Sequence, residues 1–108
     1  MRFIKNKRKF LVNKKTNLKV TDVGKIILRK NEHLTIEVSK KKNEICGMNW
    51  GLYITSSINQ RLKNEGFETV LVKNSYKKLY VMLVLKSKIK SFKKYISKEK
   101  IKIIKKLG

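Results

Sequence analysis

The sequence predicts an α+β protein with a ferredoxin-like βαββαβ core, in which a four-stranded antiparallel sheet carries two helices on one face, preceded by an N-terminal β extension. Three observations support this prediction. A strand pattern runs into a helix pattern over residues 46–62, two apolar strand patterns follow over residues 67–85, and a second helix pattern then leads into a short apolar segment. The resulting order of strand, helix, strand, strand, helix, strand fits two crossover units in one sheet.

The first strand and helix are predicted from a change of hydrophobic period. Apolar residues alternate with others along the strand, as in a strand with one buried face, at Cys46, Met48, Trp50, Leu52 and Ile54. The hydroxyl residues at 55–57 then suit a helix N-cap, and Ile58 and Leu62 fall four apart on one helical face. The helix is therefore predicted over Ser57 to Glu65, ending at Gly66, a residue that accepts positive φ.

The next three elements complete the predicted core. Phe67 to Lys73 and Leu79 to Leu85 predict a central hairpin, with Lys73-Asn74-Ser75 as its turn. Ser87 is the predicted cap of a second helix, in which Ile89, Phe92 and Ile96 face the core while Lys90 and Lys94 face water. The last strand is expected at Ile101 to Ile104.

The segment before the core predicts strands joined by polar turns. Residues 1–17 contain seven basic residues and no acid, which is typical of a basic arm. Residues 18–28 predict two short strands with a break at Gly24, and residues 33–39 alternate as a one-sided strand. Residues 40–43 then form a turn and allow a hairpin with the strand at 46–54. We therefore divide the chain into an arm at 1–17, a β extension at 18–44 and the core at 45–108.

The charge balance has two explanations that the sequence leaves open. The chain has 29 Lys and Arg against 7 Asp and Glu, a formal net charge of +22. Clustered cations neutralise phosphates, so the excess favours a polyanionic partner. Only four of these residues are Arg, however, and Ala and Pro are absent while Ile and Asn are abundant, as A/T-rich codons would produce.

The sequence offers little support for a catalytic site, a metal site or a membrane-spanning segment. The single Cys46 and the single His33 have no cluster of further ligands, so no metal and no cofactor are predicted. The acidic residues are scattered, so an enzyme is the least supported class. No apolar run has the length of a signal peptide or a membrane span, and we therefore expect a cytoplasmic protein.

The predicted strand-to-helix connection is the best candidate binding site. Unpaired amides at a helix start hold carboxylates and phosphates, and nearby polar and aromatic side chains would add contacts. The candidate ligand-binding residues are Asn49, Trp50, Tyr53, Thr55, Ser56, Ser57, Asn59 and Arg61. The favoured function is non-catalytic recognition of a small anionic or sugar-bearing ligand, or of a partner enzyme. The alternative is that these residues only cap a helix and fill the core.

Nucleic-acid binding is the second predicted function. A ferredoxin-like RNA-binding protein would present aromatic residues on its open sheet face, and Tyr53, Phe67 and Tyr80 are available. The aliphatic run at 79–85 does not match such a platform. The remaining route is electrostatic binding of RNA, DNA or a ribosomal surface through the basic arm and the lysine-rich residues 86–106.

The motif W-G-L-Y-I-T-S-S-I-N-Q-R-L, followed by G-F-E-T-V-L-V-K-N and Y-V-M-L-V, resembles a small uncharacterised bacterial family encoded near genes of surface-sugar synthesis. The resemblance covers about Ile45 to Ile104, with Trp50-Gly51, Asn59 and Arg61-Leu62 matching best. It implies an accessory or binding role in surface-polysaccharide or acidic-sugar metabolism and no established activity.

Overall fold

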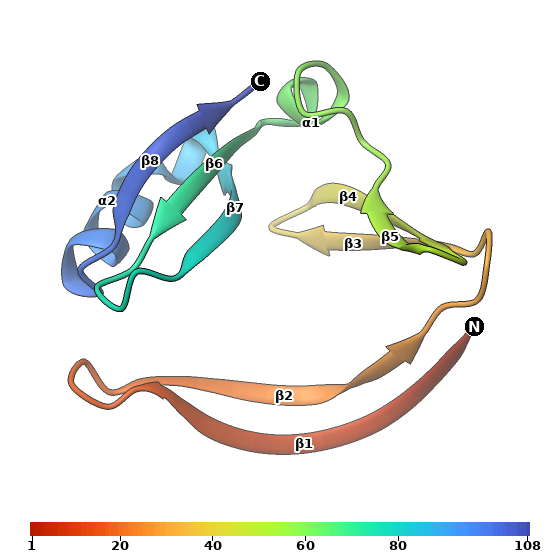
Figure 1. Ribbon diagram of the computed structural model, residues 1–108, viewed down its shortest axis with the longest axis horizontal. Helices are drawn as coiled ribbons and strands as arrows, with labels where there is room; N and C mark the ends of the chain where they lie inside the picture. The colour runs from red at the N-terminus through yellow and green to blue at the C-terminus, as the bar shows by residue number, and fades with distance from the viewer. The chain divides into compact units, whose positions relative to one another are not determined.

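A computed structural model describes residues 1–108 and shows a mostly β protein, with 56% of the residues in strands and one substantial helix. The elements in chain order are β1 (Arg2–Asn13), β2 (Leu18–Ile27), β3 (His33–Val38), β4 (Lys41–Met48), β5 (Gly51–Ile54), α1 (Arg61–Glu65), β6 (Phe67–Lys73), β7 (Leu79–Leu85), a 3-10 turn (Lys86–Lys88), α2 (Ile89–Lys98) and β8 (Lys102–Leu107) (Figure 1). The strands form three small antiparallel sheets, β1-β2, β3-β4-β5 and β7-β6-β8.

The chain divides into two compact units, which we describe separately. The first unit contains residues 1–35 and 44–55, and the second contains residues 36–43 and 56–108. The division passes through β3 and β4, so the middle sheet contributes to both units.

The predicted ferredoxin-like core is wrong. That fold requires four strands in one sheet, whereas β5 pairs with β4 and leaves a three-stranded sheet with β6 at its centre. Only one of the two predicted helices is substantial, because α1 has only five residues. Since β7 and β8 both run antiparallel to β6, they are parallel to each other, and α2 makes the crossover between them.

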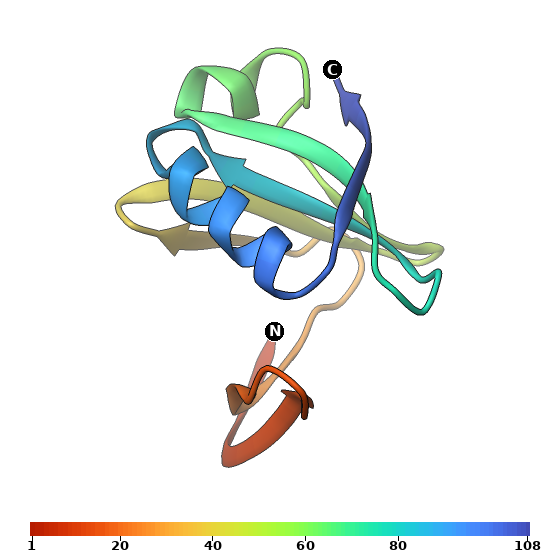
Figure 2. The same cartoon turned by 90° about the vertical axis from the view of Figure 1, so that its left-hand side faces the viewer.

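The β7-β6-β8 sheet and α2 contain the hydrophobic core of the second unit. Val70, Val72 and Val84 are buried on the sheet face that α2 covers (Figure 2). The flanking apolar side chains that pack against them are Met82, Ile89, Phe92 and Ile101. The prediction that Ile89 and Phe92 point toward the core is confirmed, and Lys90 and Lys94 are exposed as predicted.

The predicted strands of this unit are confirmed more closely than the helix boundaries. β6 and β7 have the predicted bounds, and they pair from Phe67↔Leu85 to Lys73↔Leu79. Asn74 organises the turn between them, because its side-chain oxygen accepts hydrogen bonds from the Tyr76 and Lys78 amides at 3.0 Å each. Lys73 itself belongs to β6 rather than to the turn.

Both predicted helix starts are displaced. The first helix begins at Arg61 instead of Ser57, although it ends as predicted at Gly66, whose φ of 103° is left-handed. The second begins at Ile89 after a 3-10 turn, and its N-cap residue is Lys88 rather than the predicted Ser87, which lies inside that turn. The last strand, β8, runs from Lys102 to Leu107 rather than over residues 101–104.

The β1-β2 hairpin of the first unit is a long antiparallel ladder with two register shifts. The predicted arm thus contains a strand. In place of the predicted break, Gly24 pairs with Lys5 beside a bulge in β1, where the register shifts between Lys5 and Arg8. Gly24 has a φ of 152°, and a Cβ there would lie 2.5 Å from the Ile4 carbonyl oxygen and 2.9 Å from the Phe3 ring. Glycine is therefore required because the Ile4 carbonyl oxygen and the Phe3 ring leave no room for a Cβ, and because the φ is positive.

The predicted strand over residues 46–54 is a hairpin of two strands. β4 and β5 are joined by a tight turn at Asn49 and Trp50, and Met48 pairs with Gly51. The turn preceding β4 lies at Ser39 and Lys40, whose φ values of 50° and 66° are both positive, as in a mirror-image hairpin turn. β4 consequently starts at Lys41, inside the turn that the sequence predicted over residues 40–43.

Candidate functional site

The eight predicted ligand-binding residues are divided between the two units. Asn49, Trp50, Tyr53 and Thr55 belong to the first unit, whereas Ser56, Ser57, Asn59 and Arg61 belong to the second. The helix start that was expected to gather them is absent at Ser57, and a helix of five residues offers little dipole. The predicted helix start at Ser57 is therefore wrong, and ligand binding at this connection stays a prediction.

Ser57 instead stabilises the turn that leads into α1. Its hydroxyl oxygen accepts a hydrogen bond from the Arg61 amide at 3.0 Å, and its carbonyl oxygen accepts one from the Leu62 amide at 2.9 Å. Ser56 is buried, whereas Asn59 is exposed. The purely structural role that the sequence left open for Ser57 agrees with this geometry.

Trp50 and Tyr53 form an exposed aromatic pair in the first unit. Their ring centroids lie 5.9 Å apart with an interplanar angle of 23°, so the rings are stacked. Trp50 is 68% exposed and Tyr53 is 44% exposed. Trp50 was predicted to point into the core of a continuous strand, and the turn at this position overturns that prediction. The turn-forming Asn49 and Gly51 beside it were the sequence signal for the reversal.

A second polar cluster in the first unit surrounds His33. Its Nε2 atom lies 3.2 Å from a Glu44 carboxylate oxygen and 3.3 Å from the Thr55 hydroxyl oxygen. A catalytic triad would need the acid on one ring nitrogen and the nucleophile on the other. Here both partners approach the same nitrogen, so His33 cannot be oriented by Glu44 while it activates Thr55. The cluster joins the start of β3 to β4 and to the end of β5.

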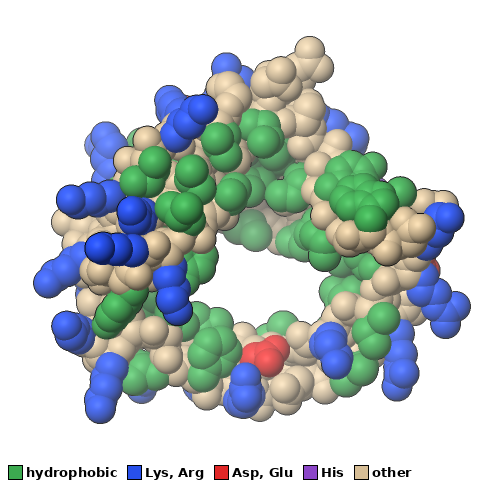
Figure 3. All heavy atoms as spheres, viewed as in Figure 1, with side chains coloured by type: hydrophobic (Ala, Val, Ile, Leu, Met, Phe, Trp, Pro, Cys, Tyr) green, Lys and Arg blue, Asp and Glu red, His purple; other side chains and the backbone are tan.

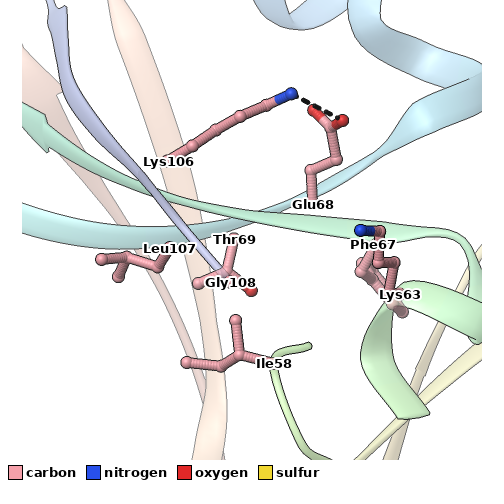
Figure 4. A pocket seen from close by; sticks show the side chains of 8 residues that line it. All are labelled: Ile58, Lys63, Phe67, Glu68, Thr69, Lys106, Leu107 and Gly108. Atoms are coloured by element: carbon pink, nitrogen blue, oxygen red, sulfur yellow. Dashed lines mark ion pairs between the residues drawn. The ribbon is translucent and has the colours of Figure 1, made fainter. Parts of the chain in front are cut away.

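A shallow pocket lies in the second unit, between the start of the α1 region, β6 and β8 (Figure 4). Its lining residues are Ile58, Lys63, Phe67, Glu68, Thr69, Lys106, Leu107 and Gly108. Lys106 forms an ion pair with Glu68 at 3.2 Å. The hydroxyl oxygen of Thr69 is buried and has no hydrogen-bond partner, although such groups are normally paired. This pocket could not be predicted from the sequence, because its residues meet only when β6 pairs with β8.

The outer face of α2 carries a row of lysines. Lys90, Lys94 and Lys98 recur four residues apart on the side opposite Ile89, Phe92 and Ile96, and all three are exposed. Their spacing places positive charge about every 6 Å along the helix axis. Like charges four apart disfavour a helix by a few tenths of a kcal/mol per pair, so this row does not serve helix stability. We call these three residues the lysine row.

Positive charge also dominates each unit as a whole. The first unit contains 11 Lys and Arg against 3 acidic residues, and the second contains 18 against 4. Even if every acid paired with one cation, most of the cations would remain unneutralised. Lysine and arginine side chains are accordingly scattered over the surface, and acidic side chains are sparse (Figure 3).

Comparison of the chain with protein-family models, with curated proteins and with solved structures yields no significant match. No group of three or more His, Cys, Asp and Glu side chains is arranged to hold a metal ion. None of the helices has the length and apolar character needed to cross a membrane.

Proposed function

We propose that this protein binds nucleic acid through its basic surface, with the lysine row of α2 as one of the contact sites. The main support for this proposal is the lysine row itself, in which three exposed cations are aligned on a helix whose opposite face packs in the core. Anchoring matters because phosphate contacts from a packed helix cost less conformational entropy than contacts from a flexible tail. Phosphate neutralisation with release of counterions supplies the affinity, and it is independent of sequence.

The test measures binding of a labelled single-stranded oligonucleotide against salt concentration. The triple variant Lys90→Gln, Lys94→Gln and Lys98→Gln removes three phosphate contacts. Its slope of log affinity against log salt should therefore be about 2 units less steep than that of the wild type. Glutamine has nearly the helix propensity of lysine, so α2 should persist.

The matched control removes the same charge elsewhere in the second unit, with Lys41→Gln, Lys77→Gln and Lys78→Gln. If charge in general attracts the ligand, both triple variants lose affinity equally and the lysine row has no special role. If the wild type fails to bind any oligonucleotide at low ionic strength, nucleic-acid binding is wrong.

A second candidate function, recognition of an acidic sugar or another small anion, is favoured by the orphaned Thr69 hydroxyl. This group lines the pocket together with Lys63 and the apolar Phe67. A ligand oxygen would complete the hydrogen bonding of Thr69, and Lys63 would offset the ligand's negative charge. Such a role would agree with the resemblance to proteins encoded near surface-sugar genes.

Thr69→Val separates this role from a structural one, because valine keeps the shape and removes the hydroxyl. The variant should be more stable than the wild type without ligand, since an unpaired buried hydroxyl costs about 1 to 3 kcal/mol. It should also lose any rise in melting temperature that acidic sugars cause in the wild type. A wild type whose melting temperature is unmoved by acidic sugars would contradict this candidate.

A further inference from the structure

The exposed Trp50-Tyr53 pair is not used by the electrostatic contacts described above. Leaving a large aromatic surface in water forgoes the stabilisation that burial would provide, and exposed aromatic residues are enriched at binding sites. The pair is held in place by a tight turn between paired strands, which restricts its motion. It therefore has the exposure and the rigidity of a recognition surface.

The other aromatic rings of the first unit are already engaged within the chain. Phe3 lies on the Gly24 backbone, and the Arg8 guanidinium carbon lies 5.5 Å from the centroid of the Phe10 ring. Tyr53 stacks on one side of Trp50. Trp50 is the most exposed of these four aromatic residues. Its ring is consequently the surface on which a further planar group can stack.

The backbone beside the pair leaves room for such a group. A Cβ built on Gly51, the neighbour of Trp50, would meet no atom within 4 Å. In the connection between β2 and β3, the Asn31 amide donates a hydrogen bond to the Gly47 carbonyl oxygen of β4 at 2.8 Å, and the Arg29 carbonyl oxygen lies against the Gly47 backbone. The exposed cations Arg29 and Lys30 therefore lie in a segment that contacts β4, the strand that leads into the turn with Trp50.

We propose that the Trp50-Tyr53 pair stacks on unpaired bases, so that the protein prefers single-stranded nucleic acid to a duplex. This inference rests on the proposed nucleic-acid binding and names its ligand class. Every base has a π-face, so stacking adds affinity without sequence specificity, whereas bases in a duplex are already stacked and inaccessible. Phosphate contacts position the strand, and the aromatic pair distinguishes unpaired from paired bases.

The test uses Trp50 as its own probe, because it is the only tryptophan of the chain. The wild type is titrated with a single-stranded oligonucleotide, with an abasic phosphodiester of equal length and with a duplex. Stacking should quench the Trp50 fluorescence only with the single strand, while anisotropy of labelled strands reports binding of all three. Equal quenching by all three polyanions would overturn the stacking platform and leave nucleic-acid binding intact.

Two variants complete the test. Trp50→Ala should weaken binding of the single strand by about tenfold and leave duplex binding unchanged. Phe10→Ala, which removes an aromatic ring that Arg8 already covers, should leave the ratio of single-strand to duplex affinity unchanged. Circular dichroism checks that both variants fold. Equal losses with both ligands, or quenching of Trp50 by an uncharged sugar instead of a base, would overturn the inference. No binding to any strand would overturn the proposed function as well.

Discussion

The β7-β6-β8 sheet with α2 and the β1-β2 hairpin are both built from well-paired antiparallel strands, but only the first has a core. Val72 at the centre of β6 is 0% exposed, whereas no residue of β1 or β2 is fully buried and Val23 in the middle of β2 is 65% exposed. An isolated two-stranded hairpin is at best marginally stable in water. Similar strand pairing should therefore give the two regions unequal stability, because burial supplies most of the stabilisation.

The largest expected effect comes from removing the same two methyl groups in each region. Val72→Ala should lower the free energy of unfolding by about 2 to 3 kcal/mol, since it leaves a cavity among Val70, Val84 and α2. Val23→Ala should change it by less than about 0.5 kcal/mol because its side chain lies in solvent. Urea denaturation followed by circular dichroism measures both. Similar losses for the two variants would mean that the hairpin carries a core of its own.

An intermediate effect is expected at Gly24, where the backbone of β2 lies close to β1. Gly24→Ala should destabilise the β1-β2 hairpin by about 2 kcal/mol, because the new methyl group clashes with Ile4 and Phe3 at a strained φ. Gly51→Ala provides the matched control, since its φ of 146° is nearly the same but its surroundings are open. It should cost only about 1 kcal/mol of strain. Amide hydrogen exchange in β1 and β2 measures the effect of Gly24→Ala. If the two substitutions cost the same free energy, the close contact of Gly24 with Ile4 and Phe3 is unimportant.

The smallest expected effect is electrostatic and concerns Glu32, which follows the hairpin. Its carboxylate accepts hydrogen bonds from the Met1 amino group and from the Arg29 amide, and these lower its pKa below 4.5. Because the folded-state pKa is lowered, the pair stabilises the protein above pH 4.5, and this contribution is lost as the pH falls through the folded-state value. The group is exposed, so solvent screens the interaction.

A carboxyl-detected NMR titration tests this sign. Acetylation of the Met1 amino group should raise the pKa of Glu32 toward its ordinary value, since the amino group is the largest cause of the shift. An unchanged titration curve after acetylation would assign the shift to the Arg29 amide alone.

Local pattern was enough to predict β6, β7 and the core-facing side of α2. Their apolar periodicities are strong, and Asn74 and Gly66 end elements by local chemistry that operates within a few residues. The prediction of one strand over residues 46–54 was wrong because it relied on the same kind of periodicity. A two-residue turn preserves the alternation of Met48, Trp50 and Leu52, so one strand and a tight hairpin share the same period-2 pattern.

The excess of positive charge, the strands β6 and β7 and the amphipathic character of α2 can be predicted from the sequence, because they depend on composition and on neighbours close in the chain. The pairing of β8 with β6 and of β5 with β4 becomes visible only in the three-dimensional structure, since periodicity indicates that a strand exists without identifying its partner. The long-range pairing of β8 with β6 created the pocket around Thr69, whereas the tight turn of the β4-β5 hairpin left Trp50 in solvent. The pocket and the exposed aromatic pair therefore depend on strand pairing, whereas the lysine row follows from the local pattern of α2.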